Sequence, residues 1–266
     1  MPLFFYTSGD ILQNEIIKGI FIPFFGTALG SACVFFINSK IKSSLTRFFS
    51  GFAAGVMVAA SVWSLLLPAL ENSGHLGIFN FFPAAAGFLT GVISLILTDR
   101  YIPLERFCFN GSKGANRIAM LVLAVTAHNL PEGIAVGAVY AGLLAGNTDV
   151  TIAGALTLSI GIGLQNFPEG AIISMPLYSS GVSRGKSFLI GALSGVVEPL
   201  GAVLALIAAK YLSILPFLLS FAAGAMIYVV VSELIPEISD KNHSVKGVLS
   251  FTLGFLLMMI LDVTLG

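Results

Sequence analysis

The chain has 266 residues, of which 56% are hydrophobic and only 10% are charged, and its 13 basic and 13 acidic side chains leave a formal net charge of zero. Charged side chains normally cover the surface of a soluble protein, so this composition excludes a water-soluble globular fold and indicates a chain that lies in lipid. A net charge of zero offers no basic field to phosphate, which excludes nucleic acid as a partner. Cys33 lies in an apolar run and Cys108 in a polar loop, so we expect neither a disulfide nor a cysteine-rich metal site.

Eight apolar runs predict eight transmembrane helices, because about 20 helical residues cross roughly 30 Å of hydrocarbon. The runs lie at residues 19–37, 48–70, 78–98, 118–145, 150–177, 187–208, 213–235 and 247–265. The fourth and fifth runs are longer than a straight crossing needs and contain proline, which predicts tilt or kinks. The first ten residues, MPLFFYTSGD, place no Lys or Arg ahead of an apolar core, so we expect no cleaved signal peptide. The expected fold is an all-α polytopic membrane protein.

Basic residues are concentrated on one side of the predicted membrane. The connections after the first, third, fifth and seventh runs hold eleven of them: Lys40, Lys42, Arg47, Arg100, Arg106, Lys113, Arg117, Arg184, Lys186, Lys241 and Lys246. The opposite side holds only Lys18 and Lys210. Since cytoplasmic loops carry the excess of Lys and Arg, both termini are expected to face away from the cytoplasm.

The chain also repeats itself. The hexad HNLPEG at 128–133 recurs as QNFPEG at 165–170, so one copy falls on each of two consecutive runs of opposite direction. A weaker echo links FAAGVM at 52–57 with FAAGAM at 221–226, on the second and seventh runs. Both echoes are typical of an inverted repeat.

Five carboxylates lie inside the predicted runs: Glu132, Glu169, Glu198, Glu233 and Asp262. A carboxylate at mid-membrane costs about 2.5 to 3.5 kcal/mol, so five of them must be compensated. No Lys or Arg lies within the body of any run. Protonation, water or a bound metal ion remain as the compensating partners.

The spacing of the hexads favours the metal ion. His128, Asn129 and Glu132 fall on one face of the fourth helix, and Gln165, Asn166 and Glu169 repeat that geometry in the fifth. Imidazole, carboxylate and amide oxygen together form a mixed nitrogen and oxygen ligand set that suits zinc, iron or manganese.

Other residues near this layer have more than one interpretation. Glu198 stands beside a proline in the sixth run and could complete the ligand layer. Met57 is a packing residue or, from its place in FAAGVM, part of the site. Glu233 and Asp262 could serve an access path, a proton relay or a second site.

The eight-run pattern, the two hexads and GALSGVVEPLGA at 191–202 resemble the ZIP family of divalent-metal transporters, in particular its compact bacterial-type GufA-like branch. The resemblance covers essentially the whole chain. It implies one transmembrane transport domain over residues 1–266, with eight helices arranged as three, two and three and the outer triplets related by inversion. It also implies a homodimer that moves zinc-type divalent ions toward the cytoplasm.

Carried over position by position, the resemblance implies a set of metal ligands between the fourth and fifth spans. In the fourth span they are His128, Asn129 and Glu132, in the fifth Gln165, Asn166 and Glu169, and in the sixth Glu198. Met57 and Asp262 correspond to positions on the access route or to accessory positions.

The chain departs from the family pattern in two places. Many relatives carry His where this chain has Gln165, and some carry Asp where it has Asn166. The carboxylates Glu132, Glu169 and Glu198 then total three negative charges, so we expect one tightly bound ion and a weaker or absent second, unless Glu233 reaches the layer. The connection at 99–117 contains no histidine, unlike the His-rich loop of many relatives.

The expected function is therefore transport of a divalent metal ion, zinc first and iron, manganese or cadmium as alternatives, by alternating access. The ion is the transported substrate, and no catalytic cofactor or enzyme activity is expected. One alternative is an intramembrane metal-dependent hydrolase, which the absence of an HExxH motif disfavours. Another is a proton or sodium carrier. The compact chain indicates a bacterial inner membrane, with the lipid bilayer as its surroundings.

Overall fold

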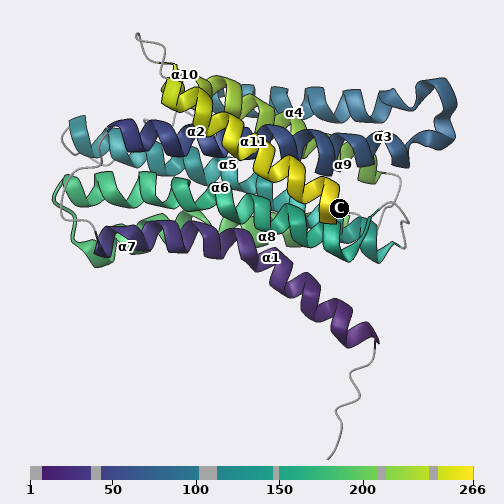
Figure 1. Cartoon of the computed structure of the whole chain (residues 1–266), viewed down its shortest axis with the longest axis horizontal. Helices are drawn as coiled ribbons and strands as arrows, with labels where there is room; N and C mark the ends of the chain where they lie inside the picture. The colour runs from purple at the N-terminus through teal and green to yellow at the C-terminus, as the bar shows by residue number, and fades with distance from the viewer. Residues whose placement is uncertain are drawn as a thin grey trace, which may run out of the picture.

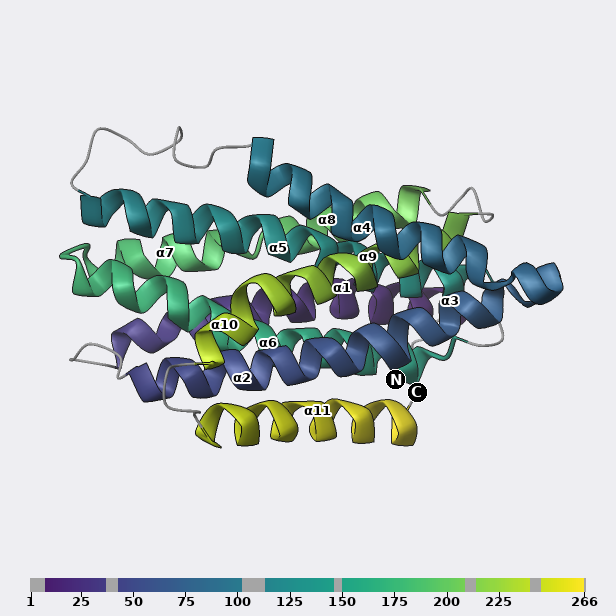
Figure 2. The same cartoon turned by 90° about the horizontal axis from the view of Figure 1, so that it is seen from above.

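The structure is a computed structural model that describes residues 8–36, 43–101, 113–145, 150–208, 214–239 and 245–265. Within these ranges there is no strand, and the long helices lie side by side along the long axis of the molecule (Figures 1 and 2). The predicted all-α class is therefore confirmed.

The helices follow the eight predicted runs in order. Their bounds are α1 (Ser8–Ala32), α2 (Ser43–Ala60), α3 (Leu67–Asn72), α4 (Phe81–Tyr101), α5 (Lys113–Leu144), α6 (Ile152–Ser179), α7 (Arg184–Ser194), α8 (Val197–Ala208), α9 (Leu215–Val229), α10 (Ile235–Ile238) and α11 (Val245–Leu265). Two 3₁₀ helices, Cys33–Phe35 and Gly74–Phe79, follow α1 and precede α4. The sixth run is divided into α7 and α8.

Six of the eight runs correspond, among the described residues, to helices long and apolar enough to cross a membrane: Leu12–Phe35, Ser44–Asn72, Leu76–Thr98, Arg184–Ala208, Leu215–Leu234 and Val245–Leu265. The other two runs form α5 and α6, which have 32 and 28 residues and carry the polar hexads. Their length and their internal prolines, Pro131 in α5 and Pro168 and Pro176 in α6, agree with the prediction of two long spans that contain proline.

The first helix begins well before its apolar run, at Ser8 rather than near residue 19. Lys18 Nζ donates to Glu15 Oε1 over 2.6 Å, one turn apart, which supports the helix in its more polar first half. Hydropathy marks only the part of a helix that lies in lipid, so it could not locate this start. Figure 1 shows α1 bent, and Pro23 lies inside the helix.

The helices form two groups. In the first group α1 packs along α6 and α5 along α8, with α7 against α1 and α6. In the second group α2 packs along α11 and α4 along α9, with α3 against α9 and α10 against α2. The principal contacts between the groups are α5 with α9 and α2 with α6. Figure 1 draws the second group in the upper half of the molecule and α1, α7 and α8 in the lower half.

Close contacts between backbones show that the first group contains an inverted repeat. A β-carbon on Gly30 of α1 would overlap the backbone oxygen of Phe167 on α6, and one on Gly201 of α8 would crowd the backbone oxygen of Leu130 on α5. Leu130 and Phe167 are the third residues of the two hexads. The pair α1 and α6 is therefore equivalent to the pair α8 and α5.

The second group repeats in the same way. A β-carbon added to any of four glycines would overlap a phenylalanine backbone oxygen on the neighbouring helix. The pairs are Gly55 with Phe251, Gly254 with Phe52, Gly224 with Phe88 and Gly91 with Phe221. Phe52 and Phe221 begin the FAAGVM and FAAGAM motifs, so the weaker sequence echo is a structural one. A π-helical turn follows each motif at the same distance, at Ser61–Leu66 and at Val230–Leu234. Because consecutive spans alternate in direction, the equivalent helices run oppositely, and the 3+2+3 inverted repeat is confirmed.

Candidate functional site

The two hexads and the start of α8 form a buried polar layer inside the first helix group. Asn129, Glu132, Gln165, Asn166 and Glu198 are each at most 1% exposed. Glu169 is partly buried. Polar groups that are withdrawn from water in this number need partners, because a buried polar atom without one costs free energy.

Glu198 is held by two donors from neighbouring helices. Thr27 Oγ1 on α1 donates to Glu198 Oε1 over 2.8 Å, and Asn129 Nδ2 on α5 donates to the same oxygen over 2.9 Å. The break between α7 and α8 places Glu198 in the first turn of α8, where the positive end of the helix dipole favours a carboxylate. The helix of the sixth span is thus interrupted just before Glu198.

Glu132 is held from the other hexad. Gln165 Nε2 on α6 donates to Glu132 Oε1 on α5 over 2.7 Å. The two helices that carry the hexads are therefore joined through the polar side chains that the sequence singled out.

The carboxylates of the layer lie close enough to repel one another. Glu132 interacts electrostatically with Glu198 and with Glu169, and Glu169 also with Glu198 and Glu233. Among the described side chains, Lys18 forms an ion pair with Glu15, far from this layer in the chain. A bound cation would offset this repulsion.

The atoms left without hydrogen bonds are the ones a cation would bind. Six buried side-chain oxygens of the described layer accept no hydrogen bond: Asn129 Oδ1, Glu132 Oε2, Gln165 Oε1, Asn166 Oδ1, Glu169 Oε2 and Glu198 Oε2. Each residue of the set turns at least one oxygen away from protein donors. Carboxylate and amide oxygens suit a hard or borderline divalent ion.

Carboxylates alone do not complete a coordination shell. Among the described side chains, no three of the His, Cys, Asp or Glu type gather closely enough to hold an ion. A metal ion in this layer would therefore also need amide oxygens or the imidazole of His128 as ligands. The backbone of His128 belongs to α5, but its side chain lies outside the described part of the chain.

The remaining candidates are Met57, Glu233 and Asp262. Met57 is buried in the hydrophobic core with α2, and its backbone oxygen accepts from Ser61 Oγ at 2.7 Å. Glu233 lies in the π-helical turn Val230–Leu234 and interacts electrostatically with Glu169 of the layer. Asp262, on α11, belongs to a different place.

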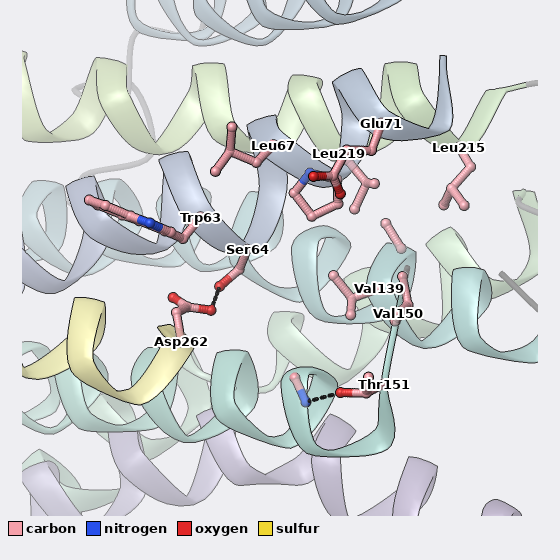
Figure 3. A pocket seen from close by; sticks show the side chains of 13 residues that line it. Trp63, Ser64, Leu67, Glu71, Val139, Val150, Thr151, Leu215, Leu219 and Asp262 are labelled. Carbon is pink, nitrogen blue, oxygen red and sulfur yellow. Dashed lines mark hydrogen bonds between the residues drawn. The ribbon is translucent and has the colours of Figure 1, made fainter. Parts of the chain in front are cut away.

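Asp262 lines a separate cavity of about 230 Å³ between the two helix groups (Figure 3). Ser64 Oγ donates to Asp262 Oδ1 over 2.7 Å, while Asp262 Oδ2 is buried without a hydrogen bond. Glu71 is a second carboxylate in the lining, and Figure 3 shows it apart from Asp262. The cavity lies where α5 ends and α6 begins, so it is at the end of the molecule that has few basic residues.

Comparison with known proteins identifies the family. Residues 109–262 match the family model described as ZIP Zinc transporter, which is more than half of the chain. The chain is 35% identical to "Zinc transporter ZIP11" of Xenopus tropicalis, over 90% of this chain and 94% of the relative. It is 34% identical to "Zinc transporter GufA" of Myxococcus xanthus, over 91% and 96%, and 36% identical to "Zinc transporter ZIPB" of Bordetella bronchiseptica, over 91% and 79%.

The chain belongs to the ZIP family. It is therefore an integral membrane protein that transports metal ions, and the hydrolase alternative is excluded because members of the family are transporters rather than enzymes.

In this ZIP transporter, sequence reasoning missed two side chains that act on acidic site candidates. Thr27 and Ser64 are hydroxyl residues inside apolar spans, where such residues normally bond their own helix backbone. The inverted repeat could have indicated Thr27, because it is the equivalent of Glu198. However, no echo between the first and sixth runs is visible in the sequence.

Proposed function

We propose that the chain moves a divalent transition-metal ion, zinc first, toward the cytoplasm, and that the ion binds the buried oxygen layer between α5, α6 and α8. The observation that supports this site is the set of six buried oxygens without hydrogen bonds. The choice of zinc rests on the relatives, each of which carries the name zinc transporter. The ligands are His128, Asn129, Glu132, Gln165, Asn166, Glu169 and Glu198.

The layer binds one ion tightly. Glu132, Glu169 and Glu198 supply three negative charges, so one divalent ion leaves a charge of −1 and two leave +1. Asn166, where some relatives carry Asp, withholds the fourth charge. Glu233 acts electrostatically on Glu169 and is a carboxylate that could supply this charge, so its contribution has to be measured separately.

The division into two helix groups supports alternating access. Both hexads and Glu198 belong to the first group, so the ligands move together when one group rocks against the other along the contacts of α5 with α9 and α2 with α6. Asp262, and with it Glu71, attracts the ion at the outer end, and Glu233 lies on the route to the cytoplasm. Met57 packs beside this route on α2.

The orientation follows from the charge of the connections. The eleven basic residues place the connections after the first, third, fifth and seventh spans in the cytoplasm, which leaves both termini outside. Residues 1–266 act as one transport domain, as a homodimer in a bacterial inner membrane. Its partners are the ion, the bilayer and a second copy of the chain.

The test is uptake of radioactive zinc into proteoliposomes. Wild type should show saturable uptake, and both His128→Ala and Glu169→Gln should lower it by about ten-fold or more, because even outer-shell changes at metal sites cost that much. Glu15→Gln, which changes a carboxylate outside the layer, is the matched control and should transport normally. Competition by cadmium, iron and manganese ranks the ions.

Two results would overturn the proposal. A correctly folded wild type that moves protons or sodium, with no zinc uptake and no competition by zinc, would make the chain a carrier of a different ion. Equal zinc uptake by wild type and Glu169→Gln would remove the layer from the transport route.

A further inference from the structure

The fully buried side chain of Thr27 reaches the ligand layer from α1, a helix that contributes no carboxylate to it. Its hydroxyl donates to Glu198 Oε1 over 2.8 Å, and Asn129 Nδ2 donates to the same atom over 2.9 Å. Oε1 therefore has two donors, whereas Oε2 is buried and has none. The carboxylate thus has one anchored oxygen and one oxygen left for another partner.

The position of Thr27 follows from the inverted repeat. The backbone oxygen of Thr27 fills the space beside Gly170 of the second hexad, and the backbone oxygen of Glu198 fills the space beside Gly133 of the first. Thr27 and Glu198 are therefore equivalent residues, one in each half of the repeat. The repeat directs both side chains to the same layer, and in this chain the first half supplies a donor while the second supplies an acceptor.

Packing holds the threonine side chain in place. A β-carbon on Gly195, at the break between α7 and α8, would lie 2.9 Å from Thr27 Cβ and 3.0 Å from Thr27 Oγ1. The other acceptor near the hydroxyl, the Pro23 backbone oxygen, is 3.5 Å away and so makes the weaker contact. The Thr27 side chain therefore packs closely against the turn between α7 and α8, and its shorter hydrogen bond is the one to Glu198.

We propose that Thr27 is a positioning residue of the metal site, whose hydroxyl fixes Glu198 Oε1 so that Oε2 faces the transported ion. This inference rests on the proposed function, since it takes Glu198 as a ligand. Ligating carboxylates at metal sites are commonly held by such hydrogen bonds, and loss of one typically lowers metal affinity about 10- to 100-fold.

The experiment measures zinc and cadmium binding to the purified full-length chain in detergent by equilibrium dialysis. Thr27→Val keeps the shape of the side chain and removes the donor, so we expect binding about 10-fold weaker than wild type. Thr27→Ser keeps the hydroxyl and should bind within about three-fold of wild type, which a purely structural role of the methyl group would not predict. Ser31→Ala is the matched control, because Ser31 is buried on the same helix and its hydroxyl donates to the Gly170 backbone oxygen at 3.2 Å.

A double-mutant cycle separates an effect through Glu198 from a direct one. In the Glu198→Gln background, Thr27→Val should cause little further loss of affinity, because the two residues act as a unit. An equal loss in both backgrounds, or Thr27→Val binding as tightly as wild type, would overturn the role of Thr27. If Thr27→Val does not fold, Thr27→Ala, which cannot clash with Gly195, gives the same comparison.

The controls also distinguish this inference from the proposed function. A wild-type chain that binds no zinc would refute the metal site itself. A wild type that binds zinc, with an unchanged Thr27→Val, would refute only the positioning by Thr27.

Discussion

Asn166→Asp tests how many ions the layer holds. Asn166 is completely buried, and neither its Oδ1 nor its Nδ2 has a hydrogen-bond partner. It lies beside both Glu132 and Glu198. The change replaces an amide by a carboxylate of the same shape, so it adds a negative charge without disturbing the packing. The formal charge of the layer becomes −4, and two divalent ions then leave it neutral instead of at +1.

The size of the effect can be estimated from Coulomb's law. Two unit charges 4 Å apart interact by about 4 kcal/mol at an effective dielectric constant near 20. Desolvation of the new carboxylate and its repulsion from Glu132 and Glu198 offset much of this. Even if only about 1.4 kcal/mol remains, the second ion binds about ten-fold more tightly. We therefore expect one ion per chain in wild type and two in Asn166→Asp at the same free zinc concentration.

The assay is equilibrium dialysis against radioactive zinc over a wide range of concentration, which gives both stoichiometry and affinity. Asn72→Asp is the matched control, because Asn72 is partly buried at the end of α3, outside the layer, and its amide donates to the Pro68 backbone oxygen at 2.7 Å. Unchanged stoichiometry and affinity in Asn166→Asp would refute the charge balance. A wild type with two ions that falls to one in Glu233→Gln would show that Glu233 supplies the fourth charge.

Three other predictions follow. Ser64→Ala removes the 2.7 Å hydrogen bond to Asp262 in the separate cavity. Uptake at low zinc concentration should then fall about three- to ten-fold through KM, while equilibrium binding at the buried layer stays unchanged. A fall in the affinity of the layer instead would contradict a separate role of this cavity. Gly30→Ala forces a β-carbon into the Phe167 backbone oxygen and should destabilise the protein by about 1 to 3 kcal/mol in thermal unfolding. Gly185→Ala, with open space around it, should change the stability little. Equal stability of the two variants would argue against the close contact of α1 and α6. Zinc affinity should rise with pH between about 5 and 8, because the imidazole and the carboxylates must lose their protons to bind the ion. Equilibrium dialysis that shows the same affinity across this pH range would disprove the coupling of metal binding to proton release.

Much of the fold could be predicted because the hydrocarbon core of a bilayer accepts few kinds of chain segment. A spanning helix must be long and apolar, and in the described part of the chain six of the eight predicted runs correspond to helices that meet both conditions. The two spans that carry the hexads are less apolar, but their carboxylates without nearby basic residues marked them as the functional pair. The FAAGVM and FAAGAM motifs also indicated the inverted repeat, because close helix contacts in lipid require small residues.

The sequence by itself determined which residues have to lie in the membrane and which of them are too polar to lie there alone: Asn129, Glu132, Gln165, Asn166, Glu169 and Glu198. Only the tertiary structure decided which of these residues contact one another and which other side chains hold them. In the folded protein the sixth span is divided into α7 and α8, and Thr27 donates a hydrogen bond to Glu198, its equivalent in the repeat. Asp262 pairs with Ser64 in a cavity apart from the buried layer. The physical reason is that hydropathy and spacing describe one helix at a time, whereas a hydrogen bond between residues far apart in the chain depends on which helices pack together.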